Sequence, residues 1–143
     1  MSQFQPRPVS PPEPESQPGS RPAPIVQKSL RPLPEPVAGA VITVSDRCAA
    51  GQREDVSGPL AARLLAEHDV IVEAVRVVPD GAEPVRGAVR EAVAAGARVV
   101  LTTGGTGITP RDLTPEGTAP LLAARMEGLE AQIRAHGLTK TPL

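Results

Sequence analysis

Aromatic side chains are almost absent from this sequence. Among its 143 residues Phe4 is the single Phe, and neither Tyr nor Trp occurs. Any hydrophobic core must therefore be aliphatic, and there is no aromatic platform on which bases could stack, as RNA-recognition and single-strand-binding domains require. The 15 basic and 16 acidic residues leave a formal net charge of −1. The chain thus also lacks the excess positive charge that drives nucleic-acid binding through counterion release.

Three further absences concern the cellular compartment. No apolar run approaches the roughly 18 residues that a membrane span needs, and the first residues, MSQFQPRPVSPPEPES, lack the apolar centre of a secretory signal. Cys48 is the single cysteine, which excludes an internal disulfide and agrees with a reducing compartment. We expect a cytoplasmic protein that binds neither a membrane nor nucleic acid.

Proline divides the chain into two parts. Eleven of the 18 prolines lie within residues 1–36, and the few apolar residues there follow neither a helical nor a strand period. Because proline removes backbone donors and holds φ near the polyproline II value, residues 1–36 are predicted to form a disordered tail. Residues 37–143 are predicted to form the domain.

From residue 37 onward apolar runs alternate with amphipathic stretches, which is typical of an α/β domain. Strands are predicted at 37–45, 70–78 and 98–103. Helices are predicted from Ser57, from the segment Asp80-Gly-Ala-Glu83 to Gly96, at 115–124, and at 129–136 with Gly137 as C-cap. The helix from Ser57 is expected to bury Leu60, Ala61, Leu64 and Leu65. The short connections favour a three-layer α-β-α domain with a mostly parallel sheet.

In such a sheet, ligands bind beyond the carboxyl ends of the strands. The sequence places polar residues at all three ends: Ser45-Asp46 after the first strand, Asp80 after the second, and Thr102–Gly107 after the third. The connection Gly51–Gly58 is polar and is expected to be mobile and to fold over a ligand. A binding site is therefore predicted at this edge.

The segment Gly104-Gly-Thr-Gly107 follows the third strand directly. Glycines permit positive φ and let a ligand approach backbone N–H groups, and the neighbouring threonine hydroxyls suit a phosphate. The segment matches neither the dinucleotide-binding nor the P-loop glycine pattern. Taken alone, it is equally consistent with a plain turn between a strand and a helix.

Charged residues follow the glycines. Asp112 is a candidate ligand for a Mg²⁺ that bridges phosphates, Arg111 could neutralise those phosphates, and Thr114 is expected to cap the next helix. A solvated surface pair is the alternative for Arg111 and Asp112. Asp80 begins a pattern that resembles a capping box, which needs no function, yet its place at a strand end also makes it a second candidate carboxylate.

Five motifs in this order resemble a known family. They are Val44-Ser-Asp-Arg47, Asp55-Val-Ser-Gly-Pro59, Val78-Pro-Asp80, Leu101–Gly107 and Arg111-Asp-Leu-Thr-Pro115. The chain from about residue 40 to residue 143 is similar to the MogA/MoaB-like molybdopterin adenylyltransferases of molybdenum cofactor biosynthesis. The resemblance implies a three-layer domain, usually a homotrimer, that transfers AMP from MgATP to the terminal phosphate of molybdopterin and releases pyrophosphate. It also implies a molybdenum-insertase partner.

The resemblance assigns roles to individual residues. Asp80 and Asp112 stand at the two family aspartates tied to catalysis and to the handling of Mg²⁺ or pterin. Binding of substrate and phosphate is implied for Ser45, Asp46, Thr103, Gly104, Gly105, Thr106, Gly107 and Arg111. Family members continue through further sheet and a loop of Asn-Leu-Pro-Gly type, so the domain is expected to be truncated at its C-terminus. A molybdopterin-binding paralogue without turnover, or a scaffold that acts through the proline-rich tail, is the alternative function.

Overall fold

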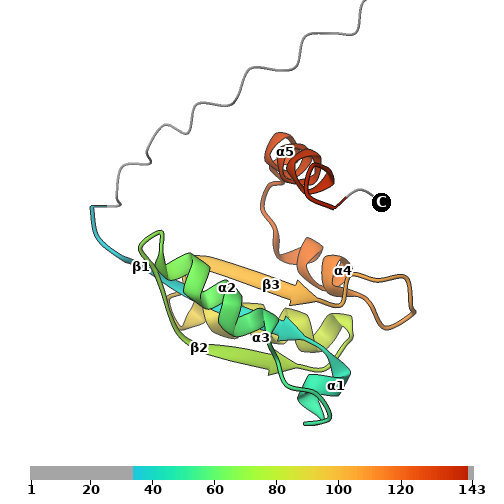
Figure 1. Cartoon of the computed structure of the whole chain (residues 1–143). Helices are drawn as coiled ribbons and strands as arrows, with labels where there is room; N and C mark the ends of the chain where they lie inside the picture. The colour runs from blue at the N-terminus through green and yellow to red at the C-terminus, as the bar shows by residue number, and fades with distance from the viewer. Residues whose placement is uncertain (1–33, 142–143) are drawn as a thin grey trace, which may run out of the picture. The chain divides into compact units, whose positions relative to one another are not determined.

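The computed structural model describes residues 34–141. Residues 1–33 of the predicted disordered tail lie outside the described residues. Strands and helices alternate along the first part of the domain (Figure 1). The elements are β1 (Val37–Val44), α1 (Asp46–Ala49), α2 (Ser57–Ala66), β2 (Val70–Val78), α3 (Ala82–Ala94), β3 (Val99–Gly104), α4 (Thr114–Thr118), the 3₁₀ helix η1 (Ala119–Leu121) and α5 (Glu127–Leu138). The three strands agree with their predicted ranges to within one residue at each end.

The strands form one parallel sheet in the order β2-β1-β3. At its carboxyl edge, Val44 lies opposite Val78 of β2 and Gly104 of β3. The residues that follow the three strands therefore begin side by side, as the sequence predicts.

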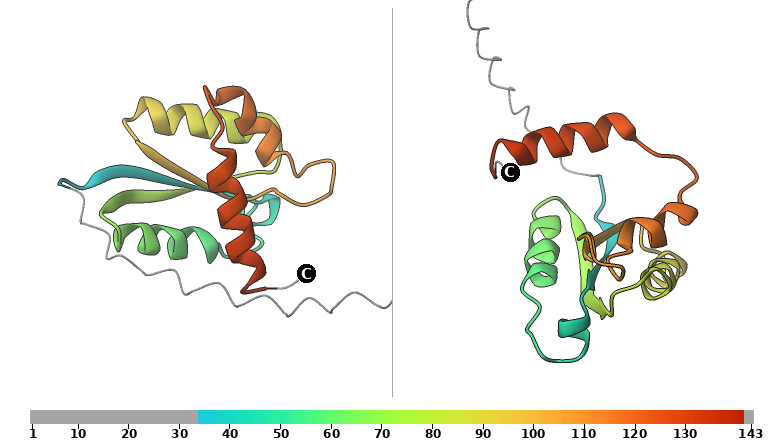
Figure 2. Two further views of the ribbon diagram at one scale, coloured as in Figure 1. Left: turned by 90° about the horizontal axis from the view of Figure 1, so that it is seen from above. Right: turned by 90° about the vertical axis from the view of Figure 1, so that its right-hand side faces the viewer.

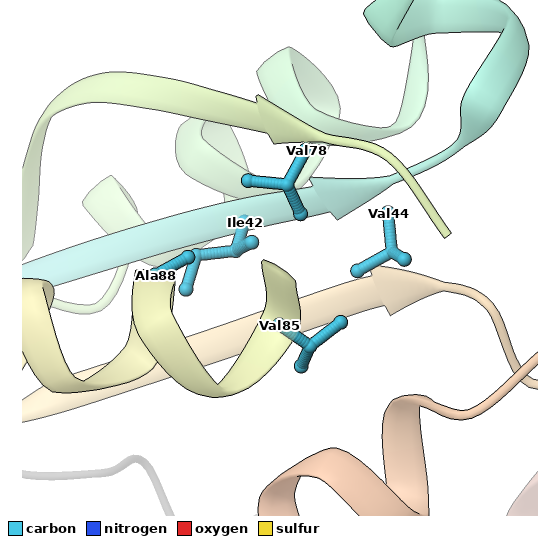
Figure 3. Packing of buried hydrophobic residues seen from close by; sticks show 5 residues of the cluster. All are labelled: Ile42, Val44, Val78, Val85 and Ala88. Atoms are coloured by element: carbon cyan, nitrogen blue, oxygen red, sulfur yellow. The ribbon is translucent and has the colours of Figure 1, made fainter. Parts of the chain in front are cut away.

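Helices cover both faces of this sheet. Figure 2 shows α2 on one side and α3 on the other, which confirms the three-layer arrangement. The core between α3 and the sheet is wholly aliphatic and consists of Ile42, Val44, Val78, Val85 and Ala88 (Figure 3). Val85 and Ala88 are 0% and 1% exposed, so α3 packs against the sheet through these two residues.

The buried face of α2 differs from the prediction. Leu60 and Leu64 are exposed, and the least exposed positions are Gly58, Ala61, Ala62 and Leu65. The helical period was correct, but the face is rotated. Gly58 explains the rotation, because a Cβ at this position would overlap Val75 Cγ1 and Thr43 Oγ1. The helix thus approaches the sheet through its glycine.

The helices after β3 also differ from their predicted ranges. The helix expected at 115–124 is the short α4 followed by η1, because Pro120 has no N–H to continue the α-helical bonds. The next helix begins at Glu127, so Gly128 lies in its first turn, and its C-cap is Thr139 in place of Gly137. Within residues 34–141 no helix is both long and apolar enough to cross a membrane.

Candidate functional site

A pocket of about 670 Å³ opens at the carboxyl edge of the sheet. Its lining includes the sequence-predicted candidates Ser45, Asp46, Asp80, Thr103, Gly104, Gly105 and Asp112. Thr106, Gly107 and Arg111 are exposed and do not line it. The fold therefore gathers most of the candidates, from three separate strand ends, around one cavity.

The two glycines at the end of β3, Gly104 and Gly105, are required by the protein's own packing. Gly104 and Gly105 have φ values of +91° and +61°. A Cβ on Gly104 would overlap the Val44 carbonyl oxygen; one on Gly105 would overlap Thr114 Oγ1 and lie 2.8 Å from Val44 Cγ1. Sequence reasoning explained these glycines by the approach of a ligand to the backbone. At Gly105, Val44 of β1 and Thr114 of α4 occupy the space that a Cβ would take, so packing within the protein by itself requires glycine here.

Thr114 fixes the conformation of these two glycines. Its side chain is buried, its N–H donates to the Gly105 carbonyl at 3.0 Å, and its hydroxyl donates to the Gly104 carbonyl at 2.9 Å. The predicted helix cap is therefore wrong: the N-cap position is Leu113, and no side chain caps α4. The hydroxyl instead binds the carbonyl at the end of β3, and this bond holds the glycine segment against α4.

Asp46 and Asp80 lock the ends of β1 and β2 together. The Asp46 N–H donates to Asp80 Oδ2 at 2.8 Å, and the Asp80 N–H donates to Asp46 Oδ1 at 3.1 Å. The capping-box prediction for Asp80 is wrong, since the N-cap of α3 is Gly81 and receives no side-chain bond. The Asp80 carboxylate points toward β1, and Oδ1 lies 3.4 Å from the position of a Cβ on Gly105. Within residues 34–141 this oxygen has no hydrogen-bond partner.

Arg111 binds the same pair from the rim. Its Nε and Nη2 each lie 2.8 Å from an oxygen of the Asp46 carboxylate, and Nη2 also donates to the Asp80 carbonyl at 3.1 Å. Arg111 thus pairs with Asp46, not with Asp112 as the surface-pair alternative assumed. Its side chain is 62% exposed, so the guanidinium remains accessible to an anion at the pocket mouth.

The carboxylate of Asp112 is held by the turn before it. The N–H and the hydroxyl of Thr109 donate to Asp112 Oδ2 at 2.9 and 2.6 Å. The Thr109 hydroxyl, followed by the N–H groups of Thr109 and Gly107, keeps the pKa of Asp112 below its ordinary value. Asp112 is therefore a carboxylate at neutral pH, and it faces the pocket with Asp80.

Sequence reasoning quoted Asp55 within a family motif but gave it no role, and it missed the partner of Asp55, Thr43. Asp55 Oδ2 accepts from the buried Thr43 hydroxyl at 2.7 Å, and Oδ1 accepts from the Gly58 N–H at 3.0 Å and the Ser57 hydroxyl at 3.1 Å. Burial raises the pKa of Asp55, but these hydrogen bonds outweigh it and leave the pKa below the ordinary value. An Asp three residues before a helical N–H is a capping signal that the sequence does contain.

Ser45, predicted to bind substrate, is the N-cap of the short helix α1. Its hydroxyl accepts from the Cys48 N–H at 3.3 Å, and its own N–H donates to the Val78 carbonyl at 2.9 Å. These bonds explain why the chain turns at the end of β1. Ser45 also lines the pocket, so the role that the resemblance implies stays a prediction.

The carboxylates present suit a metal that arrives with its substrate. Among residues 34–141 no group of three or more His, Cys, Asp or Glu side chains is placed to hold a metal ion. Mg²⁺ commonly takes one or two carboxylates and completes its shell with water and substrate phosphates. Asp80 and Asp112, which line the same pocket, match that donor set.

Comparison with known proteins identifies the domain. The family model described as "Probable molybdopterin binding domain" matches residues 40–142. The chain belongs to this family. A molybdopterin adenylyltransferase of Pyrococcus furiosus is 46% identical to this molybdopterin-binding domain over 98 residues, which are 67% of the chain and 56% of that protein. A molybdenum cofactor biosynthesis bifunctional protein of Synechococcus elongatus is 41% identical over 105 residues, 73% of the chain and 33% of that protein.

Solved structures agree with this assignment. The tungsten cofactor synthesizing protein MoaB of Pyrococcus furiosus superposes with a TM-score of 0.68 at 41% identity, covering 76% of this chain and 67% of that one. A molybdopterin biosynthesis protein of Mycobacterium abscessus gives 0.69 at 43% identity, covering 73% and 65%. The predicted family and fold class are confirmed, and the chain spans about half the length of the Pyrococcus adenylyltransferase.

Proposed function

We propose that this molybdopterin-binding domain transfers AMP from ATP to the terminal phosphate of molybdopterin, with release of pyrophosphate, in molybdenum cofactor biosynthesis. Two relatives bear the name molybdopterin adenylyltransferase, at 46% and 33% identity. The observation that carries the proposal is the pocket at the carboxyl edge, which Asp80, Asp112, Gly104 and Gly105 line together.

The reaction joins two phosphates. An oxygen of the molybdopterin phosphate forms a bond to the α-phosphorus of ATP, and the bond from that phosphorus to the bridging oxygen of the β-phosphate breaks. Because several negative charges meet, the protein acts chiefly by positioning and by charge neutralisation. Asp80 and Asp112 would hold Mg²⁺, which neutralises phosphate charge when bound.

The other candidate residues take supporting roles in this proposal. Arg111 offers its exposed guanidinium to a substrate phosphate at the rim, and Asp46 holds it there when no phosphate is bound. Ser45, Thr103, Gly104 and Gly105 contact substrate along the strand ends, with Thr106 and Gly107 outside the pocket. A homotrimer, a molybdenum-insertase partner and a cytoplasmic location stay predictions of the family resemblance.

The test is a pyrophosphate-release assay with purified protein, MgATP and molybdopterin. We expect pyrophosphate only when both substrates are present, and none with either one alone. Binding of molybdopterin without pyrophosphate would favour the paralogue without turnover. If molybdopterin does not bind, the proposed function is wrong.

A further inference from the structure

The carboxylates that line the pocket differ in how their oxygens are used. Asp80 leaves Oδ1 without a partner among the described residues. Asp55 lines the same pocket, but both of its oxygens accept hydrogen bonds from the protein, Oδ2 from Thr43 and Oδ1 from Ser57 and Gly58. A carboxylate engaged in this way is poorly suited to bind a metal or to accept a substrate proton.

The partners of Asp55 belong to two different parts of the fold. Thr43 lies in the central strand β1 and its side chain is 3% exposed, while Ser57 and Gly58 begin α2. Gly58 packs so closely that a Cβ there would overlap Asp55 Oδ2 and Thr43 Oγ1. The carboxylate therefore sits at a fixed junction between the sheet and the helix.

The segment 50–57 forms one wall of the pocket through Arg53, Glu54 and Val56. Residues 51–53 are tied back to α1 through the carbonyls of Arg47 and Cys48. Within residues 34–141, the Thr43–Asp55 bond is the single hydrogen bond that joins segment 50–57 to the sheet. The second half of this wall thus depends on Asp55 for its place over the pocket.

We infer that Asp55 is a positioning residue: it holds segment 50–57 against β1 so that this segment closes one side of the pocket on the bound substrate. The inference rests on the proposed function for the identity of that substrate. Asp55 does not touch the reacting atoms. Loss of the Asp55 carboxylate weakens substrate binding, because segment 50–57 must then become ordered each time a substrate binds. The rate of the chemical step for a bound substrate stays largely unchanged.

The test compares Asp55→Ala, Asp55→Asn and Thr43→Val with wild type. The matched control is Asp69→Asn, directly before β2 and at the opposite edge of the sheet, where Asn tolerates the φ of +60°. Four quantities are measured for each protein: amide hydrogen exchange of residues 51–56 without ligand, the Kd for molybdopterin, and the KM and the kcat in the pyrophosphate assay. Melting temperature shows whether each variant is folded.

For Asp55→Ala we expect faster exchange at 51–56 and a rise in Kd and KM of about tenfold or more, because the buried Thr43 hydroxyl also loses its partner. kcat changes by less than KM. Asp55→Asn keeps an acceptor for the Gly58 N–H and recovers part of the loss. Thr43→Val shifts the same quantities in the same direction, and Asp69→Asn shifts none.

Two results overturn the inference. One is a loss of kcat with unchanged KM, which would make Asp55 a catalytic residue. The other is unchanged exchange at 51–56 in folded Asp55→Ala. If wild-type protein does not bind molybdopterin, the proposed function fails, and the exchange measurement alone decides whether Asp55 holds the wall.

Discussion

Replacing Gly105 by Ala tests whether the glycine segment is built for packing within the protein. The added Cβ would overlap the hydroxyl oxygen of buried Thr114 and lie 2.8 Å from Val44 Cγ1, at a φ of +61°. The left-handed conformation costs an L-residue about 1–2 kcal/mol. Overpacking a well-filled site costs about 1–3 kcal/mol more. The free energy of unfolding should therefore fall by about 2–5 kcal/mol, a large part of the roughly 5–15 kcal/mol of a typical domain.

Gly51→Ala is the matched control, because Gly51 has nearly the same φ, +67°, and nothing within 4 Å of its added Cβ. It should lose only the conformational cost, about 1–2 kcal/mol. The assay is urea unfolding monitored by far-UV circular dichroism. The free energies of unfolding of the two variants are compared with a common m-value. If the two variants lose equal stability, the packing argument for Gly105 is wrong.

Three further predictions concern the carboxylates of the pocket. Asp80→Asn keeps an acceptor for the Asp46 N–H, so the melting temperature should barely change while pyrophosphate release falls strongly; full activity would remove Asp80 from the site. Asp112→Asn removes a negative Mg²⁺ ligand, and turnover should drop by about two orders of magnitude or more, with weaker dependence on Mg²⁺ concentration; an unchanged Mg²⁺ titration would contradict this role. The pKa of Asp55 is lower in the folded protein, so its stabilisation is present above the unfolded pKa of about 4 and is lost as pH falls below it. The difference in urea midpoint between wild type and Asp55→Asn should accordingly shrink on acidification. A difference that grows would contradict the lowered pKa of Asp55 in the folded protein.

The sheet could be predicted from local sequence because each strand contains a run of apolar, mostly β-branched residues. The run Val37–Val44 is one such case, and it becomes the central strand, whose second half, Val41–Val44, is buried. The helices were predicted less well where a single residue decides the geometry. Gly58 rotates α2 by its close approach to Thr43 and Val75, and Pro120 ends α4 early. The spacing of apolar residues along the sequence does not reveal either effect.

The site was predicted in outline, because parallel strands bring their carboxyl ends together. The hydrogen-bond partners of individual side chains were not predicted. Asp80 resembles a local cap, but its carboxylate binds the Asp46 N–H, 34 residues away, and Asp55 binds Thr43, 12 residues away. Local spacing suggests the nearest partner, whereas the fold supplies a partner from another strand.

The most direct measurement of the central claim is the mass of the pterin product after incubation with MgATP and molybdopterin. The account predicts molybdopterin that carries one added adenylyl group in the wild type, and far less of it with Asp112→Asn under the same conditions. Unmodified molybdopterin in the wild type, from protein shown to be folded and to bind MgATP, would contradict adenylyl transfer at this pocket.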